Sequence, residues 1–338
     1  MRNPQPDLSA REPSVRPEPG RRRVVQAAVA LPLLGLVSAC APRRPLILAG
    51  RPWPGYEPLF LAHTLGYLPK QVRLMEPPSH DAMISLLKAG EIDGVMLTLD
   101  QIIQLRDEGT DLTIVLVFDI SKGADVLLAR PGLTRLASLR GRRIGLVDSA
   151  LGHLMLSMTL EKAGLRPGDV QTRLIAYEHH DLAWARGEVD ALLTYEPMAT
   201  KVRKLGGRPL LSTRDLPDTI FDVLAVRPEA LLSHGETLRD ALAGHFRALT
   251  YLRQNPWDSA YRIATRLEIS AEELIGSLRG MELPDLIGNQ RYLSARDGDL
   301  HRVTTRLSAI MLQTGIIRRP ADLEALYTGA YLPGGPAT

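Results

Sequence analysis

One segment of this chain occurs twice. Residues 90–96 read Gly-Glu-Ile-Asp-Gly-Val-Met, and residues 187–193, which begin 97 positions later, read Gly-Glu-Val-Asp-Ala-Leu-Leu. Seven matched positions alone could mark only a favoured turn from helix to strand, because glycine is the usual residue where a helix ends in the left-handed region. Three further pairs share the same spacing: Ile47 with Ile144, Gly55 with Gly152, and Asp81 with Glu178. Several matches at one spacing predict a structural repeat.

Short apolar runs alternate with amphipathic stretches that end at glycine, around both copies of the segment. This alternation is typical of βα units and predicts an α/β fold with mostly parallel sheets. Two arrangements remain open: two layers of one large sheet, or two similar lobes whose strand ends line a shared crevice, where open α/β sheets bind ligands. The expected strands are residues 46–49, 72–75, 94–98, 112–118, 143–147, 172–175, 191–195 and 220–226.

The last third of the chain is predicted to be helical. Apolar residues recur at three-and-four spacing over residues 231–253, 257–267, 271–281 and 300–313. We interpret these helices as a tail that completes the first lobe. The predicted lobes are residues 45–129 with 223–338, and residues 130–222. The chain would then cross between the lobes twice, near residues 127–133 and 217–226, and two crossings make a hinge.

The net charge of +3 belongs to the first 40 residues. Of 41 Lys and Arg and 38 Asp and Glu, this leader contains six and three, which leaves 35 of each in the body. A balanced body argues against the one-sided basic surface that nucleic-acid binding through phosphates needs, so we expect no nucleic-acid partner. Residues 1–20 are rich in proline and poor in apolar side chains, and we expect them to be disordered.

Residues 21–40 resemble a bacterial export signal. Three arginines precede an apolar run of about 16 residues, which is shorter than the roughly 20 needed for a permanent membrane span. The run ends in Val-Ser-Ala-Cys at residues 37–40, which resembles the lipobox of bacterial lipoproteins, where the Cys thiol receives a diacylglycerol. We therefore expect Cys40, the single cysteine, to carry a lipid that anchors the mature chain to a membrane in the periplasm or cell envelope. A free or buried cysteine is the alternative, and export by the twin-arginine or the general pathway stays open.

Residues 53–62 read Trp-Pro-Gly-Tyr-Glu-Pro-Leu-Phe-Leu-Ala, and residues 65–68 read Leu-Gly-Tyr-Leu. In order and content, these and later segments resemble the solute-binding proteins of ABC importers in the nitrate/sulfonate/taurine group, which share their fold with binders of thiamine pyrimidine precursors. The resemblance implies a two-lobed, type II periplasmic-binding-protein fold and a monomer without cofactor or catalysis. It also implies delivery of a captured solute to an ABC permease in the cytoplasmic membrane. The later segments are residues 90–93, 123–125, 139–145, 163–165 and 195–197.

Aromatic and helix-opening residues are the first candidates for the ligand site. Trp53 and Tyr56 follow the first expected strand in a stretch rich in proline and glycine, where their rings could stack on a planar solute, with core packing as the alternative. Ser149, Ala150 and Leu151 open an expected helix, and their backbone N–H groups could hold an oxyanion. Ser149 could equally serve only as a helix cap.

Acidic residues recur at the ends of expected strands and suggest the kind of solute. Some of them, Asp81, Asp100 and Glu196 among them, could cap helices instead. The cleft loops carry few basic residues, namely Arg51, Lys122 and Arg130, whereas a bare sulfonate or nitrate would favour more positive partners. We therefore favour an organic nitrogen-containing solute, such as an aminopyrimidine, over a simple anion. The complete predicted set of ligand-binding residues is Trp53, Tyr56, Asp81, Thr98, Asp125, Ser149, Ala150, Leu151, Tyr177, Tyr195, Glu196 and Asp222.

The sequence contains no GxSxG, HExxH, CxxC, GxGxxG or Walker A motif. His179 and His180 lie beside Glu178, but adjacent side chains on a helix diverge by about 100° and cannot share a tetrahedral site, so we expect a solvated helix start and no metal. The main alternative is an enzyme on the same fold, of the thiamine-pyrimidine or menaquinone-pathway type, although the cysteine-rich motif of that synthase is missing. A ligand-sensing partner of a membrane receptor is a third class.

Lipidation of Cys40 is directly testable in the native host. Growth with radioactive palmitate should label the wild-type protein, because the thiol is expected to receive a diacylglycerol that carries the labelled fatty acids, and should leave Cys40→Ala unlabelled. Immunoprecipitation and autoradiography measure the label. A wild-type protein as free of label as the variant would contradict the lipid anchor.

Overall fold

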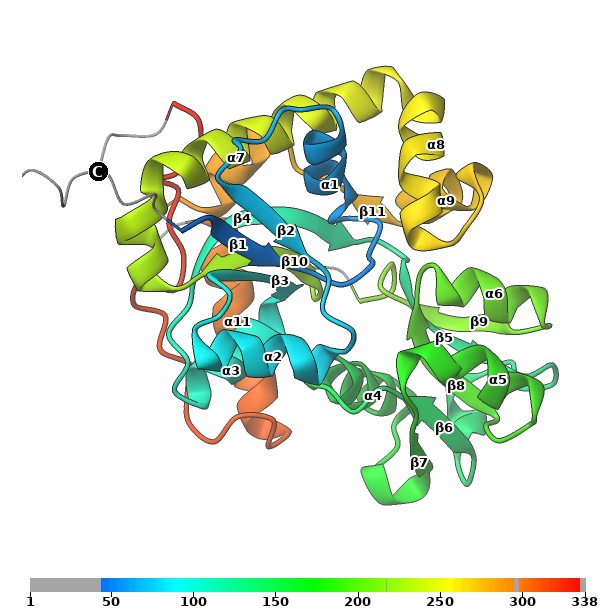
Figure 1. The fold of residues 1–338 in the computed structure, drawn as a ribbon. Coiled ribbons are helices and arrows are strands. Elements are labelled where there is room, and N and C mark those ends of the chain that lie inside the picture. Colours follow the sequence, from blue (N-terminus) through cyan, green and yellow to red (C-terminus); the bar gives the residue numbers. More distant parts are fainter. Residues whose placement is uncertain (1–43, 217, 295–297, 335–338) are drawn as a thin grey trace, which may run out of the picture. The chain divides into compact units, whose positions relative to one another are not determined.

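The computed structural model describes residues 44–216, 218–294 and 298–334. The expected export signal and Cys40 lie outside these residues. The described chain contains two β-sheets, each with helices packed on both faces (Figure 1). Among the helices of these ranges, none is both long and apolar enough to cross a membrane.

The first sheet has six strands in the order β11-β4-β10-β3-β1-β2. Strands β2, β1 and β3 pair in parallel, whereas β10 is antiparallel to both of its neighbours, β3 and β4. The central strands β3, β4 and β10 are buried along their whole length, because helices cover both faces. The bounds are β1 (Leu46–Ala49), β2 (Val72–Met75), β3 (Gly94–Thr98), β4 (Thr113–Ser121), β10 (Phe221–Val226) and β11 (Met281–Glu282).

The second sheet has five strands in the order β7-β6-β8-β5-β9. Here β7, β6 and β8 pair in parallel, and β5 is antiparallel to both β8 and β9. Each sheet is therefore mixed: a strand that runs the other way is inserted among the parallel strands that the sequence predicts. The bounds are β5 (Asp125–Ala129), β6 (Arg143–Leu146), β7 (Gln171–Leu174), β8 (Ala191–Tyr195) and β9 (Arg208–Ser212).

Helices cover both faces of each sheet. On the first sheet α1 and α7 lie on one face and α2, α3 and α11 on the other, and on the second sheet α5 and α6 lie opposite α4 (Figure 1). The predicted helical C-terminal region is confirmed. The bounds are α1 (Glu57–Thr64), α2 (His80–Ala89), α3 (Leu99–Asp107), α4 (Ala150–Ala163), α5 (His180–Ala185), α6 (Met198–Lys204), α7 (Pro228–Gln254), α8 (Pro256–Leu267), α9 (Ala271–Leu278), α10 (Leu286–Tyr292) and α11 (Asp299–Gln313), with short 3-10 turns η2 (Leu136–Leu139), η3 (Pro167–Asp169) and η4 (Tyr177–His179).

The 97-residue repeat is present in the structure. Strand β6 begins 97 residues after β1, β8 begins 97 residues after β3, and the glycines that open the repeated segment, Gly90 and Gly187, both adopt positive φ, 75° and 72°. The spacing extends further than the sequence comparison suggested, because it also relates Asp125 at the start of β5 to Asp222 in β10. Each repeat therefore supplies five strands in the same order.

The fifth strand of each repeat pairs in the sheet of the other repeat. Strand β5 follows β4 along the chain, yet it joins the second sheet between β8 and β9, while β10 joins the first sheet between β3 and β4. The predicted lobe boundaries at residues 129 and 222 thus differ from sheet membership, since Asp125–Ala129 belongs to the second sheet and Phe221–Val226 to the first. The sequence pattern of a fully buried strand does not show which strand it pairs with. Periodicity therefore could not assign β5 or β10 to a sheet.

Two aspartates of the repeated segment hold the start of the first strand in each repeat. The Oδ2 of Asp93 accepts the backbone N–H of Ile47 at 2.8 Å, and the Oδ2 of Asp190 accepts that of Arg143 at 2.9 Å. Asp93 is buried, whereas Asp190 is partly exposed and also binds the Arg143 guanidinium. The aspartate of the repeated Gly-Glu-X-Asp sequence therefore links the start of the third strand of each repeat to the start of the first strand.

Replacement of Asp93 should destabilise the fold. Asp93→Ala leaves the Ile47 amide without its acceptor, which costs about 1–3 kcal/mol of unfolding free energy. The exposed neighbour Glu91 provides the control, and Glu91→Ala should stay within about 0.5 kcal/mol of wild type. Urea unfolding followed by circular dichroism measures both, and equal midpoints for the two variants would contradict the structural role.

Candidate ligand site between the two sheets

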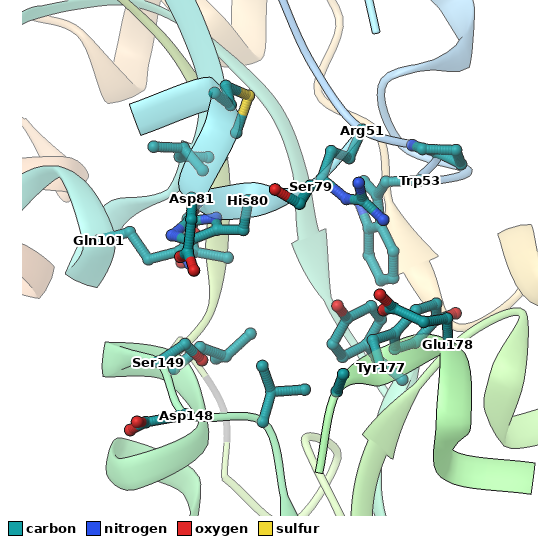
Figure 2. A pocket seen from close by; sticks show the side chains of 18 of the residues that line it. Arg51, Trp53, Ser79, His80, Asp81, Gln101, Asp148, Ser149, Tyr177 and Glu178 are labelled. Carbon is teal, nitrogen blue, oxygen red and sulfur yellow. Dashed lines mark hydrogen bonds between the residues drawn. The ribbon is translucent and has the colours of Figure 1, made fainter. Parts of the chain in front are cut away.

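A cavity of about 440 Å³ is lined by residues from both sheets, a volume typical of small-molecule sites. Parallel strands end at the edge where the inserted antiparallel strands begin, so Thr98 of β3, Tyr195 of β8, Asp125 of β5 and Asp222 of β10 all reach it. Figure 2 shows two facing groups of side chains. Arg51, Trp53, Ser79, His80, Asp81 and Gln101 lie on one side, and Asp148, Ser149, Tyr177 and Glu178 lie on the other.

The structure brings ten of the twelve predicted residues to this cavity: Trp53, Tyr56, Asp81, Thr98, Asp125, Ser149, Leu151, Tyr177, Tyr195 and Asp222. Ala150 lines a neighbouring hollow beside α3 and α4 instead. Glu196 is buried behind the wall, where it accepts the backbone N–H of Thr200 and pairs with Arg203. The N-cap residue of α6 is Pro197, and Glu196, one position before it, accepts a first-turn amide of the helix without being the cap residue.

Four aromatic rings line the cavity, and three of them form a continuous wall from Trp53 on one side through Tyr195 to Tyr177 on the other. Tyr177 and Tyr195 stack with centroids 4.4 Å apart and planes 9° from parallel, and Trp53 meets Tyr195 edge-on at 5.7 Å. Tyr56 packs edge-on against Phe118 behind it, with centroids 5.1 Å apart. Such a wall suits the flat or apolar part of a solute. Trp53 and Tyr56 are buried among other residues and also line the cavity, so packing and exposure to a ligand coexist.

The polar ends of the first two aromatic residues bind carboxyl groups. The Nε1 of Trp53 donates to Asp119 Oδ2 at 2.8 Å, and the Tyr56 hydroxyl donates to Asp222 Oδ1. No side chain fits at Gly55, which lies between them, because a Cβ there would be 1.7 Å from Asp119 Oδ2. The loop after β1 is thus fixed by hydrogen bonds to two aspartates.

Four aspartates, Asp100, Asp119, Asp125 and Asp222, are at least 96% buried, and the last two line the cavity. Burial raises the pKa of Asp100 to about 6 and that of Asp125 to about 7. Burial and the neighbouring charges raise the pKa of Asp119 and of Asp222 well above the usual range. Within the part of the chain that the structure describes, Asp125 Oδ2, Asp119 Oδ1 and both carboxyl oxygens of Asp100 have no hydrogen-bond partner. The cavity is therefore lined by one poorly compensated acid, Asp125, with further buried acids near it.

The helix-capping expectations turn out differently for each residue. Ser149 caps α4 by accepting the Gly152 N–H at 3.1 Å, in agreement with the plainer of its two predicted roles. Asp81 and Asp100 do not cap, since the caps of α2 and α3 are Ser79 and Thr98, one residue outside each helix. Asp81 stands exposed at the rim, and Asp100 is buried.

The paired histidines separate. His180 is buried, where Nδ1 contacts the Thr194 hydroxyl at 3.0 Å and Nε2 contacts the Ile175 carbonyl at 3.2 Å, and burial lowers its pKa to about 4. The predicted solvated helix start is therefore wrong for His180 and right for the exposed His179. No group of three or more His, Cys, Asp or Glu among the described residues could hold a metal ion.

Several lining residues escaped the sequence analysis, namely Ser79, His80, Gln101, Asp148 and Glu178. Arg51 was noted on a cleft loop but left out of the predicted set, and its guanidinium binds the carbonyls of Pro77 and Pro78 at 3.3 and 2.7 Å. The other two noted cations lie elsewhere: Lys122 pairs with Asp218, and Arg130 packs over Trp184. The 97-residue repeat relates Asp81 to Glu178. The sequence therefore already indicated the two segments that contain these residues.

Comparisons with known proteins identify the fold and the family. The fold is that of periplasmic binding proteins: the aliphatic sulphonate binding protein of Escherichia coli superimposes with a TM-score of 0.70 at 20% identity, over 85% of this chain and 92% of that one. The alkanesulfonate-binding protein of Xanthomonas axonopodis, bound to MOPS, superimposes with 0.70 at 18%, over 85% and 99%. The model of the NMT1-like family matches residues 40–267, so the chain belongs to that family.

Sequence relatives agree with a binding role. A Brucella abortus protein named as a binding protein is 23% identical over 212 residues, which is 62% of this chain and 66%, just under two thirds, of the relative. An Escherichia coli protein named as an aliphatic sulfonates-binding protein is 28% identical over 167 residues, 48% of this chain and 52% of the relative. The desulfurization enzyme DSZB shares the fold at 17% identity with a TM-score of 0.62, so the fold also serves catalysis.

The buried carboxyl of Asp125 should make stability depend on pH. Between about pH 4 and pH 7 the folded chain holds a proton that the unfolded chain has lost, so this group lowers the unfolding free energy as pH rises. Asp125→Asn does not titrate. Relative to wild type it should therefore gain about 2–3 kcal/mol between pH 5 and pH 8, at 1.36 kcal/mol per pKa unit.

Denaturant unfolding at the two pH values measures this difference, and the effects of the buried histidines cancel because both proteins contain them. The control is Asp148→Asn at the exposed rim, which should change by less than about 0.5 kcal/mol. A variant of Asp125 whose advantage does not grow with pH would contradict the raised pKa.

Proposed function

We propose that this protein is an exported, lipid-anchored solute-binding protein that captures a small organic solute in the cavity and delivers it to an ABC importer. The observation that carries the proposal is the cavity itself, in which residues of both sheets face one space and present aromatic rings beside unpartnered carboxyl oxygens. Membership of the NMT1-like family and the sulfonate-binding relatives support transport as the context.

Hinge closure is the proposed mechanism. The chain passes between the sheets after β4, through residues 122–124, and after β9, where the described residues are 213–216 and 218–220. The two crossings contact each other: the hydroxyls of Ser121, at the end of β4, and Thr213 lie 2.7 Å apart, and the Gly123 N–H donates to Thr213 Oγ1 at 2.7 Å. A solute that contacts Trp53 on one side and Tyr177 on the other binds best when both sides are close. The solute would therefore shift the population towards the closed form.

The lipid anchor and export route are part of the proposal. They rest on the basic residues, the apolar run and the lipobox-like end at Cys40 in the leader. A lipid would keep the binder near its permease in the cytoplasmic membrane. Loss of solute uptake on deletion of the gene would separate this role from that of a sensor for a membrane receptor, which would leave uptake intact.

Catalysis is the second candidate, because an enzyme, DSZB, shares the fold. Incubation of the protein with a retained solute distinguishes the two. A binder releases the solute unchanged on denaturation, whereas an enzyme converts it, and mass spectrometry of the released compound reports which occurs.

Solute retention should depend on Trp53. Cys40→Ala protein, incubated with an extract of the native host and washed, should carry about one solute per chain, and Trp53→Ala in that background should lose it by roughly tenfold or more because a lining ring is removed. Native mass spectrometry counts the bound solute.

The matched control is Trp257→Ala on α8, which removes a half-exposed indole that does not line the cavity. It should retain the solute. Trp53→Phe, which keeps a ring, separates loss of the wall from loss of fold. Equal retention by the Trp53→Ala and Trp257→Ala proteins would argue against this cavity as the binding site.

A further inference from the structure

The charged side chains that line the cavity are mostly acidic. Five carboxyl groups face the cavity, those of Asp81, Asp125, Asp148, Glu178 and Asp222. Among the described lining residues, Arg51 is the only Lys or Arg, and its Nη1 is already held by the carbonyls of Pro77 and Pro78. His80 does not offset this excess, since burial lowers its pKa. The cavity therefore presents more negative than positive groups to a solute.

Asp125 gives this excess a specific position. The residue is 4% exposed and lines the cavity, and its Oδ2 has no hydrogen-bond partner among the described residues. A buried carboxyl oxygen without a donor is costly, and groups of this kind are normally satisfied by protein, water or ligand. Asp125 is paired across the strands with Tyr195, whose ring belongs to the aromatic wall. A donor that reaches Oδ2 from the cavity would therefore be attached to a body that contacts Tyr195.

The equivalent residue of the other repeat lies at the same cavity. Asp222 follows Asp125 by 97 positions, pairs across the strands with Thr98 and Asp119, and accepts the Tyr56 hydroxyl through Oδ1. Two carboxyls thus reach one space from two sheets, with rings beside both. Aromatic faces attract cations within about 6 Å of the ring centre, and a carboxylate adds charge and hydrogen-bond acceptors.

We propose that the solute is an organic cation that carries N–H donors, a protonated amine or an amidinium on an aromatic or apolar body, with its nitrogen bound between Asp125 and Asp222. This inference rests on the proposed function and deepens it by naming the substrate class. The body of the solute lies against Trp53, Tyr177 and Tyr195. A sulfonate in the same place would meet carboxyls in a poorly solvated space, where like charges repel strongly.

Binding of such a cation is coupled to loss of a proton. Burial keeps the pKa of Asp125 near 7 in the empty site, and a cation beside it favours the ionised form. The ionisable groups that interact with Asp125 are Asp100 of α3, Asp119 of β4, Asp222 of β10, Tyr195 and Glu196 at the end of β8, and Tyr177 of η4. All of them are acids. Affinity for a cation should therefore rise with pH, by roughly tenfold between pH 6 and pH 8, as the ionised fraction rises.

The test is isothermal titration of the full-length Cys40→Ala chain with probes that differ only in their head group. Benzyl and naphthylmethyl rings each carry ammonium, amidinium, hydroxyl or sulfonate groups. We expect the ammonium and amidinium probes to bind at least tenfold tighter than the sulfonates at pH 8, and to weaken towards pH 6. A sulfonate or neutral probe that binds tightest, or tightens as pH falls, would overturn the cation.

Two variants locate the site. Asp125→Asn should weaken the ammonium probes by roughly 10- to 100-fold, as expected for loss of one charged hydrogen bond, and should abolish the rise with pH. Asp111→Asn, at an exposed residue that does not line the cavity, is the matched control and should change affinity by less than about threefold, because solvent screens its charge. Equal affinity in the Asp125→Asn variant would contradict the assignment.

The outcomes separate the two levels of inference. Sulfonate binding without amine binding would overturn the cation and leave the solute-binding function standing. Absence of binding by every probe, together with no solute retained from host extract, would contradict the proposed function itself.

Discussion

The backbone hydrogen bonds of β5 and β10 are the interactions on which the other features depend. Each strand completes the sheet of the other repeat and runs against its neighbours there. An antiparallel strand begins at the edge where its parallel neighbours end. The first residues of both exchanged strands, Asp125 and Asp222 among them, therefore reach the cavity. The same exchange creates the two crossings, so the proposed hinge and the position of these two aspartates have one origin. Neither could be altered without the other.

The buried aspartates show how stability and binding oppose each other. Burial raises the pKa of Asp100, Asp119, Asp125 and Asp222, and repulsion from neighbouring carboxyls raises it further for the last three, which makes the site without solute a source of instability at neutral pH. Trp53 and Tyr56 relieve part of it by donating to Asp119 and Asp222. A solute with N–H donors would relieve the remaining cost of burying these carboxyls. The free energy that destabilises the protein without solute would then contribute to binding affinity.

The sequence located the strands well and their partners poorly. Strands β1, β3 and β8 fall on the expected residues because each is an apolar run bounded by turn residues. Strands β5 and β9 were not expected: β5 follows β4 with no helix between them, and β9 reads Arg-Pro-Leu-Leu-Ser, a short edge strand with a proline. In the site, strand-end reasoning found the aspartates and rings. It missed Ser79, His80 and Gln101, because a loop's path and a side chain's direction depend on tertiary packing.

The strand exchange also says something about how such a chain is built. Residues 46–129 alone would contain four strands of one sheet. Their fifth strand, β5, would have to pair in the sheet of a second copy of the fragment. Such a fragment could complete its hydrogen bonds as a symmetric dimer, by mutual donation of β5, with the same aspartate contributed by each subunit. The present chain has the strand connectivity that such a dimer would have if its two halves were joined. Linkage frees the two halves to diverge, so that one keeps Thr98 where the other has Tyr195, and a symmetric cleft can hold an asymmetric molecule.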